Sequence, residues 1–480
     1  MSDIARGAIP AAGDAPPPAA APYQPPQPPQ PQRRQKASGI VDLIRLARRN
    51  YLDVFTQGVF NRDVIFARLL FRDVVICNSP ETVAEAFVEQ HEIFQRKSPQ
   101  HRHALAPLLG DGLFVSDGPL WRDRRRLVAP VTHATRLAEL APAITEVAAD
   151  RAAAWRRHPS DAPLDVLAEM GRLTAEIICR TIFGRGLGAE AAATVVAAFA
   201  DYQRLVDQTD LISLLGLPDW VPRLTGRRAR AAAGRIHAVV DRLILDILED
   251  RATEASLIRS MAAAKLPGPD GAPARPMDRR AFRNEAIVLF MAGHETTANV
   301  LAWALFILSQ DAASAARLDA ELQAVLGGRP ATLDDLPSLP FTRAVVEETM
   351  RLYPPVPLRS RQALADGRIA GRVVRKGAIV LVAPWVLHRR ETLWSDPHAF
   401  VPDRFMPGAP RPSRHVYIPF SVGPRVCTGQ HLGLAEAMIC LATLFQAAKL
   451  ELWPGTEVWP VARLTLRPGD ALPMRVVPRG

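Results

Sequence analysis

Cysteine is scarce in this chain, with only Cys77, Cys179, Cys427 and Cys440 among 480 residues. No two of them form a CxxC pair, and so few thiols over this length argue against the disulfide framework of a secreted domain. The sequence therefore predicts a reduced, cytoplasmic setting.

The first residues lack the apolar run of a signal peptide or a membrane anchor. Ten prolines instead fall between Pro10 and Pro31. Such a composition supports no packed core, so we expect a disordered, polyproline-like tail over residues 1–37 and a folded region over 38–480. The stretch "PPQPPQP" also fits a ligand for an aromatic-lined groove.

Basic stripes with interleaved aromatic residues and zinc-finger spacings are both missing, which argues against nucleic-acid binding. Lys and Arg nevertheless number 59 against 49 Asp and Glu, for a net charge of +10. A surface that receives an acidic protein fits this excess better. Hydrophobic residues make up 48% of the chain, enough for a large core, and the length by itself suggests about three domains.

The periodicity predicts mostly helix. An amphipathic helical pattern begins near residue 38, and "VIFARLLFRDVVICN" (64–78) reads as a pair of strands. Residues 80–354 are almost wholly helical in pattern, with a clear loop at 266–276. Short strands, an irregular coil at 395–414 and a helix over 430–448 follow, so we expect a mainly α fold with small β-sheets.

Residues 286–308 form one hydrophobic stretch long enough to span a bilayer. Its midpoint carries the polar sequence "HETT", and a charge at that depth is costly unless it serves a site. No second span of comparable strength exists in the sequence. We therefore expect no membrane span but a buried central helix in a large core.

The polar middle of this helix, "AGHETT", has more than one interpretation. A zinc-protease HExxH motif is excluded because Ala298 stands where the second histidine is required. A helix–helix contact at Gly293 explains the segment, with the hydroxyls bonded to helix carbonyls. A proton relay through Glu295 and Thr296, beside a glycine that leaves room for a small ligand, explains it equally well.

A second helix carries an acid–base pair, Glu348-x-x-Arg351 in "FTRAVVEETMRLYPP". Residues three apart share a helical face, although this spacing alone is weak evidence. The apolar neighbours indicate burial, and a buried pair needs a third group to complete its hydrogen bonds. Arg404, in the coil sequence "VPDRF", is the candidate.

Cys427 lies in the loop "PFSVGPRVCTGQHLGLAEAM" (419–438), just ahead of a helical pattern. The thiolate form of cysteine binds metals, and its pKa falls near cations and helix N-termini, which Arg425 and the following helix provide. Gly423 and Gly429 would allow a tight turn that aims N–H groups at the sulfur. The alternative to a metal-binding role is that Cys427 is packed in the hydrophobic core, and this is what we expect of Cys77, Cys179 and Cys440.

This stretch, Phe420-x-x-Gly-x-Arg-x-Cys-x-Gly, resembles the haem-binding signature of the cytochrome P450 family. "AGHETT" is similar to the oxygen-activating segment of the family's long helix, and "ETMR" with "PDRF" to its Glu-x-x-Arg pair and coil arginine. "GPLWRDRRRLVAP" resembles the helix that contacts the haem propionates. The motifs occur in the family's order over residues 38–480. "PDRF" departs from the family's more usual glutamate at its second position.

The resemblance implies one helical domain rather than three and assigns site residues. Haem b would be bound by Trp121, Arg125, Arg361, Phe420, Arg425, Cys427 and Gly429, with the Cys427 thiolate as the metal ligand. The catalytic residues lining the distal pocket would be Gly293, Glu295 and Thr296, and this resolves the open interpretation of "AGHETT" toward the relay. Glu348, Arg351 and Arg404 would be structural.

The resemblance also implies a monooxygenase that inserts one oxygen atom of O₂ into a small apolar substrate, by hydroxylation or epoxidation. Electrons from NAD(P)H would arrive through a separate ferredoxin or flavodoxin with its reductase. The enzyme would be a monomer of the soluble bacterial type. Candidates for a basic docking face are Arg122, Arg124, Arg414 and Lys449.

Two alternatives remain open: a peroxygenase driven by hydrogen peroxide, and a haem-binding sensor or carrier without turnover. By analogy with the family, the substrate pocket would be walled by residues 98–115, 203–222, 356–359 and part of the stretch after 461. His101, Arg102 and His103 fit a substrate carboxylate, although a surface loop explains them equally well. Fatty acids, terpenoids and aromatic compounds all remain possible substrates.

Overall fold

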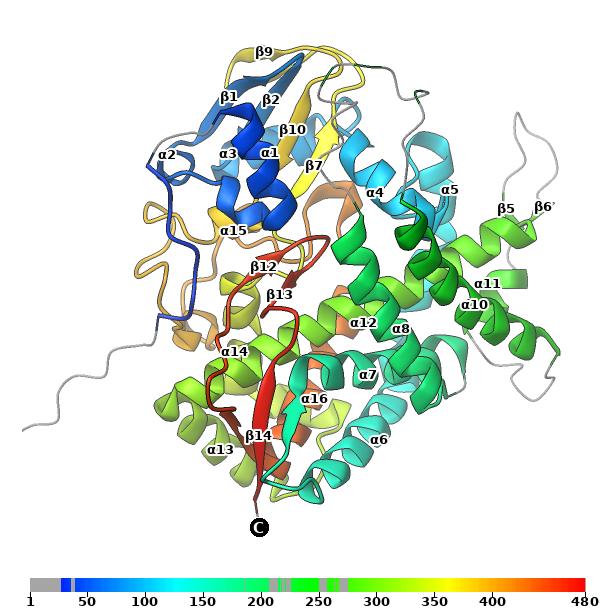
Figure 1. Cartoon of the computed structure of the whole chain (residues 1–480), viewed down its shortest axis with the longest axis vertical. Helices are drawn as coiled ribbons and strands as arrows, with labels where there is room; N and C mark the ends of the chain where they lie inside the picture. The colour runs from blue at the N-terminus through cyan, green and yellow to red at the C-terminus, as the bar shows by residue number, and fades with distance from the viewer. Residues whose placement is uncertain are drawn as a thin grey trace, which may run out of the picture.

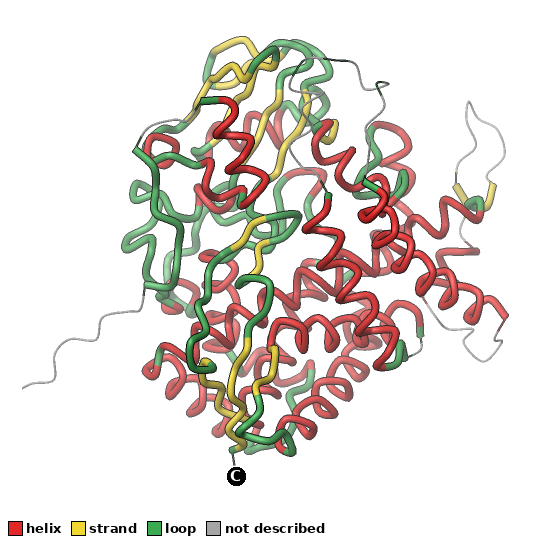
Figure 2. The backbone as a smooth tube through the Cα atoms, in the orientation of Figure 1, coloured by secondary structure: helices red, strands yellow, loops and turns green. Residues whose placement is uncertain are grey.

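Helices and strands occupy different parts of the molecule in the computed structural model (Figures 1 and 2). The structure describes residues 27–35, 39–184, 186–206, 215, 217, 221, 226–249, 257–263, 265–266 and 275–479. The fold is mainly α with small β-sheets, as predicted from the sequence. Residues 267–274 of the predicted loop at 266–276, and part of the predicted pocket wall at 203–222, lie outside the described residues.

The central element is helix α12, Arg279–Gln310, which crosses the molecule beneath other helices (Figure 1). Asp278 caps its N-terminus by accepting a hydrogen bond from the Ala281 amide at 2.8 Å. The helix is buried on almost every side, as expected for a helix that is apolar all round. No described helix combines the length and the apolar character needed to cross a bilayer.

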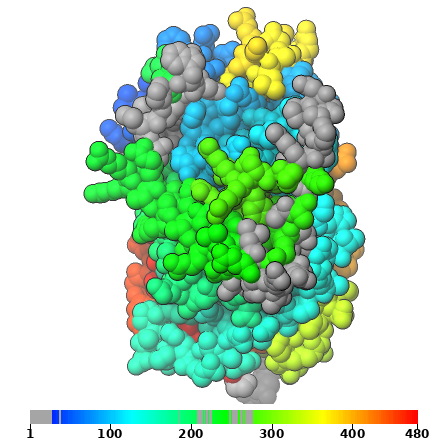
Figure 3. All heavy atoms as spheres, turned by 90° about the vertical axis from the view of Figure 1, so that its right-hand side faces the viewer, coloured from blue at the N-terminus to red at the C-terminus, as the bar shows by residue number. Residues whose placement is uncertain are grey.

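The helices that surround α12 form the main layer of the fold. They are α4 (Pro99–Leu109), α5 (Gly118–Val128), α6 (Leu137–Arg156), α7 (Val166–Ile178), α8 (Ala189–Leu205), α10 (Arg227–Glu249), α11 (Leu257–Ala263), α13 (Ala312–Leu326), α14 (Pro340–Leu352) and α16 (Gln430–Ala447). α7 and α16 pack directly on α12, so the central helix contacts both the middle and the C-terminal part of the chain. α8, α10 and α11 cover one face of the molecule (Figure 3).

The largest sheet lies at one end, in the order β1-β2-β10-β7-β3. Its strands are β1 (Val64–Leu69), β2 (Arg72–Cys77), β3 (Arg96–Lys97), β7 (Arg359–Gln362) and β10 (Ile379–Val382). β1 and β2 form the antiparallel pair predicted from the sequence. β7 pairs with β10 and β3, which brings residues 96–97 beside residues 361–362.

Smaller sheets join distant parts of the chain. Strands β11 (Ala448–Leu452), β14 (Pro473–Pro478) and β4 (Pro163–Asp165) form one of them. β12 (Val461–Ala462) and β13 (Leu466–Arg467) form a hairpin whose tip reaches the central cavity. The short pairs β5 (Lys265–Leu266) with β6 (Arg275–Pro276), and β8 (Gly367–Ile369) with β9 (Arg372–Val374), lie at the periphery.

Part of the N-terminal segment packs against the domain, contrary to the prediction of a disordered tail over 1–37. The Tyr353 hydroxyl donates to the Pro29 carbonyl at 2.7 Å. The Arg33 guanidinium lies 3.7 Å above the centre of the Phe60 ring. These contacts bind residues 27–35 to the surface, while residues 1–26 and 36–38 lie outside the described residues.

Candidate haem site

A cavity lies between α12, α5, the cysteine loop and the start of α16. Residues 355–361 and the tip of the β12–β13 hairpin complete its wall. About 330 Å³ of it is open to the centres of water-sized molecules, which lies within the roughly 300–1000 Å³ usual for pockets that bind organic ligands.

Cys427 lies in the wall of this cavity. It alone among the four cysteines has an exposed side chain, and the cavity is what it is exposed to; Cys77, Cys179 and Cys440 are buried, as predicted. The loop around it is closed by the Cys427 amide, which donates to the Phe420 carbonyl at 2.9 Å. Phe420 lines the same cavity. The sulfur is thus presented to the cavity on a fixed loop.

The protein around the cavity shields the Cys427 thiol from bulk solvent and thereby raises its pKa above the ordinary value, whereas the sequence predicted a lowered one. The Gly429 amide, which donates to the sulfur, and the charges of Arg359 and Arg125 act in the opposite direction but do not outweigh burial. A buried thiolate needs further positive charge, and a bound iron ion would supply it.

The two glycines of the loop have different roles. Gly423 has φ +71°, and a Cβ atom there would lie 2.2 Å from the Phe87 carbonyl oxygen, so only glycine fits. At Gly429 the nearest atoms to an added Cβ are 4.0 Å away, which leaves room for alanine. The tight turn expected at Gly423 is confirmed, while Gly429 contributes its N–H group.

Basic side chains gather along one side of the cavity. They are Lys97, Arg125, Arg359, Arg361 and Arg425. Among the described residues of the wall the only acidic one is Glu436, and burial raises the pKa of its carboxyl well above the ordinary value, which favours the neutral form. Buried cations require anionic partners. The wall is therefore built for a ligand with negatively charged groups.

The cationic side of the cavity still has unused hydrogen-bond donors. Arg359 Nη1 and Arg425 Nε have no partner in the described part of the chain. Arg425 Nη2 donates to Asp117 Oδ1 at 3.0 Å, and its guanidinium lies 4.3 Å from the centre of the Trp121 ring. Haem carries two propionates on one edge, so these residues fit that cofactor: cations for the carboxylates and a thiol for the iron.

Sequence reasoning missed Lys97 and Glu436 as wall residues. β3 places Lys97 beside Arg361 on β7, and burial together with Arg361, Arg425 and Arg359 lowers the pKa of Lys97 well below its ordinary value. The local sequence "FQRKSPQ" contains no spacing that distinguishes this lysine from the other bases. Only the pairing of two distant strands reveals it.

On the α12 side, Gly293 and Thr296 line the cavity as predicted. The Thr296 hydroxyl donates to the Ala292 carbonyl at 2.7 Å. An added Cβ on Gly293 would lie 2.4 Å from Cδ1 of Ile178, at the end of α7. Gly293 therefore both borders the cavity and permits the close approach of two helices, so both interpretations of this glycine hold.

Glu295 is not part of the described cavity wall, and the prediction that it lines the pocket is wrong. Its side chain is buried on another face of α12, where Oε1 accepts hydrogen bonds from Gln203 Nε2 and Thr465 Oγ1, both at 2.9 Å. Consecutive helical residues point about 100° apart, which separates Glu295 from Thr296. Thr465, at the tip of the β12–β13 hairpin, does line the cavity and thus links Glu295 to it.

The acid–base pair of α14 is buried as expected, with both side chains 0% exposed. Arg351 Nε donates to Glu348 Oε2 at 2.6 Å, and its Nη atoms donate to carbonyls of the following coil. Arg404 Nε donates to Glu348 Oε1 at 3.4 Å. The three predicted residues are therefore brought together, and they hold the coil against α14.

His388 extends this network to the cysteine loop and was not identified from the sequence. Its Nδ1 donates to the Arg351 carbonyl at 3.1 Å, and its Nε2 accepts from the Ile418 amide at 3.1 Å. Burial, with the charge of Arg351, lowers the pKa of His388 well below its ordinary value, so it is neutral. Ile418 is two residues before Phe420, so the α14 network fixes the entry to the loop.

Arg124, predicted as a docking residue, is buried and only 2% exposed. Its Nη1 donates to Glu285 Oε1 at 2.6 Å, and its Nη2 donates to Asp111 Oδ1 at 3.1 Å. It shares the inner face of α5 with Trp121 at the i,i+3 spacing. That prediction is wrong, whereas Arg122 and Arg414 are exposed as it requires.

Comparisons with known proteins agree with this geometry. The family model described as "Cytochrome P450" matches residues 43–471. Cyclooctatin synthase of Streptomyces melanosporofaciens is 31% identical, over 87% of this chain and 88% of its own. Cyclooctat-9-en-7-ol 5-monooxygenase of the same organism is 30% identical over 78% and 79%, and human cytochrome P450 4V2 is 28% identical over 77% and 74%. The chain therefore belongs to the cytochrome P450 family and is a haem-dependent monooxygenase.

Proposed function

We propose that this enzyme inserts one oxygen atom of O₂ into an apolar organic substrate, with electrons from a separate redox partner. The observation that carries the proposal is the single cavity-facing cysteine, Cys427, in the same cavity wall as five basic side chains. Haem supplies the oxygen and redox chemistry when it is bound. Held by the Cys427 thiolate, haem would supply chemistry that includes O–O bond cleavage.

The chain's own residues hold the cofactor in this proposal. Cys427 ligates the iron, and the cationic wall binds the propionates through Arg125, Arg361 and Arg425, with Trp121 packed under the Arg425 guanidinium. Lys97 and Arg359 join these residues because they line the same side of the cavity. Glu348, Arg351 and Arg404 contribute by positioning the loop.

Proton supply rests on hydroxyl groups at the cavity wall. Thr296 is the first candidate, since it lines the cavity and its hydroxyl keeps one hydrogen bond to the helix backbone. We place Glu295 behind the wall, where it exchanges protons with the cavity through the hydroxyl of Thr465. General acid catalysis of this kind typically contributes about 10²–10⁴-fold to a rate.

The substrate is proposed to be apolar, because leucine, valine and phenylalanine side chains form most of the wall away from the cations. These include Leu105, Leu108, Leu109, Leu113, Phe199, Val288, Leu289 and Val300. One relative is named as a monooxygenase of cyclooctat-9-en-7-ol, an alcohol. This supports a substrate dominated by hydrocarbon surface.

The test is replacement of the ligand. Cys427→Ser is expected to abolish the red-shifted Soret band that thiolate-ligated, reduced haem shows under carbon monoxide, while Cys77→Ala, at a buried cysteine outside the cavity, keeps it. A serine hydroxyl has too high a pKa to ligate iron as an anion in the same way. An unchanged band in Cys427→Ser would refute the assignment.

A further inference from the structure

The helix that carries Trp121 and Arg125 continues beyond α5 toward the cysteine loop. α5 passes directly into the short helix η3 (Ala129–Thr132), and Thr132 is its last residue. Trp121, Arg125 and Thr132 all line the haem cavity. One continuous stretch of helix therefore borders the cavity from its basic side to the surroundings of Cys427.

Thr132 lies next to Gly429, the residue whose amide donates to the Cys427 sulfur. A Cβ atom placed on Gly429 would have the Cys427 sulfur and the Thr132 Cβ atom as its nearest neighbours, each at 4.0 Å. The threonine side chain and the sulfur therefore flank the same glycine. The fold thus brings residue 132 beside a cysteine that lies almost 300 residues further along the chain.

The Thr132 hydroxyl is buried and has no hydrogen-bond partner in the part of the chain that the structure describes. The residue as a whole is only 6% exposed. A buried polar group without a partner costs about 1–3 kcal/mol, so folded proteins seldom leave one unsatisfied. The hydroxyl can therefore serve a group that binds in or beside the haem cavity.

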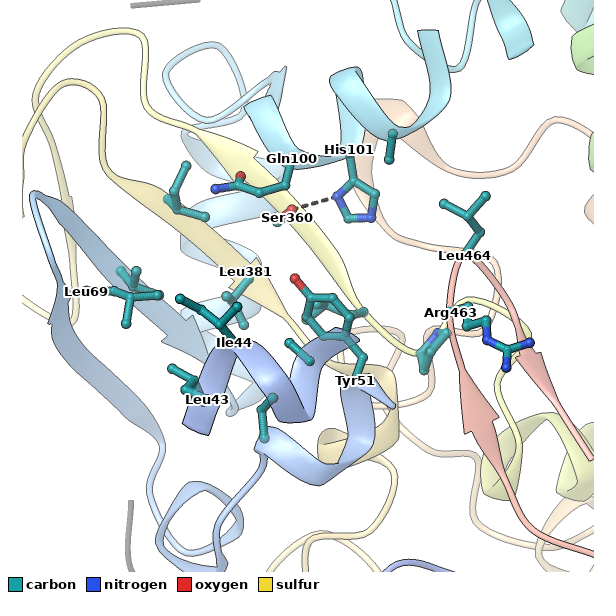
Figure 4. A pocket seen from close by; sticks show the side chains of 17 residues that line it. Leu43, Ile44, Tyr51, Leu69, Gln100, His101, Ser360, Leu381, Arg463 and Leu464 are labelled. Carbon is teal, nitrogen blue, oxygen red and sulfur yellow. Dashed lines mark hydrogen bonds between the residues drawn. The ribbon is translucent and has the colours of Figure 1, made fainter. Parts of the chain in front are cut away.

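Hydroxyl groups elsewhere in the helices and in the cavity wall do have partners. The hydroxyls of Thr174, Thr181, Thr296 and Thr349 each donate to the carbonyl four residues earlier, at 2.7–2.9 Å. On another part of the wall, His101 Nδ1 and Ser360 Oγ lie 2.7 Å apart (Figure 4). Thr132 makes neither kind of contact within the described residues, which sets it apart from these side chains.

We propose that the Thr132 hydroxyl, directly or through one ordered water, donates a hydrogen bond to the Cys427 sulfur when haem is bound, and thereby raises the reduction potential of the iron. This rests on the proposed function, in which Cys427 is the iron ligand. Hydrogen bonds to a ligating sulfur draw negative charge away from the metal and stabilise its reduced state. Because Thr132 acts through the sulfur, it is a positioning residue and not a catalytic one.

Replacement of Thr132 by valine tests this in the haem-loaded protein, because valine has nearly the same shape but no hydroxyl. The equilibrium constant for one-electron reduction is expected to fall about tenfold in Thr132→Val, which corresponds to a potential about 59 mV lower. The iron–sulfur stretching band in the resonance Raman spectrum should move to higher frequency, since a sulfur without this hydrogen bond binds iron more strongly. Thr132→Ser keeps the hydroxyl and should match wild type in both measurements.

Thr181→Val is the matched control, since it removes a buried hydroxyl at a position outside the described cavity wall, and it should leave both measurements unchanged. Thr132→Ala removes the same hydroxyl as Thr132→Val and repeats the test if the valine variant does not retain haem. An unchanged potential in these variants would overturn the proposal.

A changed potential with an unchanged iron–sulfur band would also overturn it, because the hydroxyl would then act on a propionate and not on the sulfur. Failure of the proposed function is a separate outcome. It would appear in wild type as a missing iron–sulfur band, whereas the role of Thr132 is judged by the difference between variants that all show this band.

Discussion

Thr296 and Glu295 are neighbours in the chain, but their side chains lie on different faces of α12. Thr296 borders the haem cavity, and Glu295 is held behind the wall by Gln203 and Thr465. A motif that reads as one relay in the sequence is therefore divided between two faces of α12. The hydroxyl of Thr465, far away in sequence, is what connects the carboxylate to the cavity.

Removal of the Thr296 hydroxyl should uncouple electron use from product formation. In Thr296→Ala the reductant is still consumed, but product per reductant should fall by about tenfold or more, with hydrogen peroxide released, because a general acid is lost from the wall. Thr296→Ser keeps the hydroxyl and should retain most of the coupling. Measured ratios of product, peroxide and consumed reductant that are equal in Thr296→Ala and wild type would contradict the relay.

The site roles of residues that lie within a family motif could be predicted from the sequence. The roles of residues outside any motif could not. Cys427 was found because glycines, an arginine and a helix start surround it in the sequence. Lys97 and His388 carry no such local pattern, since each acts through a partner brought in by the tertiary fold. The raised pKa of Cys427 was also missed, because burial is invisible in a linear sequence.

At the scale of elements, α14 and its coil form the frame behind the cysteine loop. Arg351 binds carbonyls of residues 388, 397 and 399, and His388 passes the connection on to Ile418. The sequence predicted the three charged members of this frame, the β1–β2 pair and the buried α12. It did not predict the packing of residues 27–35, because this packing does not follow from local periodicity.

Breaking the Glu348–Arg351 pair should destabilise the protein far more than removing a solvent-exposed arginine from the same helix. Glu348→Gln leaves the guanidinium buried without its counter-charge, an effect of about 3–5 kcal/mol on the free energy of unfolding. Arg343→Ala removes an exposed arginine that lies 3.4 Å from the buried Glu347. Because Arg411 also lies 3.8 Å from this carboxylate, the change should cost only about 1 kcal/mol. Urea denaturation followed by tryptophan fluorescence compares the two variants.

Haem incorporation provides an independent readout of the same frame. If the network positions the loop, Glu348→Gln should bind haem more weakly, as seen from faster transfer of haem to an acceptor protein, while Arg343→Ala should match wild type. Equal unfolding free energies and equal transfer rates in both variants would show that the buried pair has no positioning role.

At the scale of the whole molecule, the excess of basic residues matters most on the outer surface of α5, the helix that contributes to the cavity around Cys427. The net charge is +10, but not every basic residue is available to a partner protein. Arg124 forms a buried ion pair with Glu285, whereas Arg122 is exposed on α5. α5 also carries Trp121 and Arg125 in the cavity wall. Lys449 follows the 18-residue helix α16, about 27 Å from the cysteine end, and pairs with Glu451 at 2.9 Å.

Charge reversal at Arg122 should therefore slow reduction by an acidic electron donor, and reversal at Lys449 should not. With a small acidic ferredoxin as the probe, the second-order reduction rate of Arg122→Glu is expected to fall by about tenfold at low salt, and its dependence on ionic strength should flatten. Lys449→Glu carries the same change in net charge and thus controls for long-range attraction. Stopped-flow rates that fall equally in both variants would place the docking surface elsewhere, because only total charge would then matter.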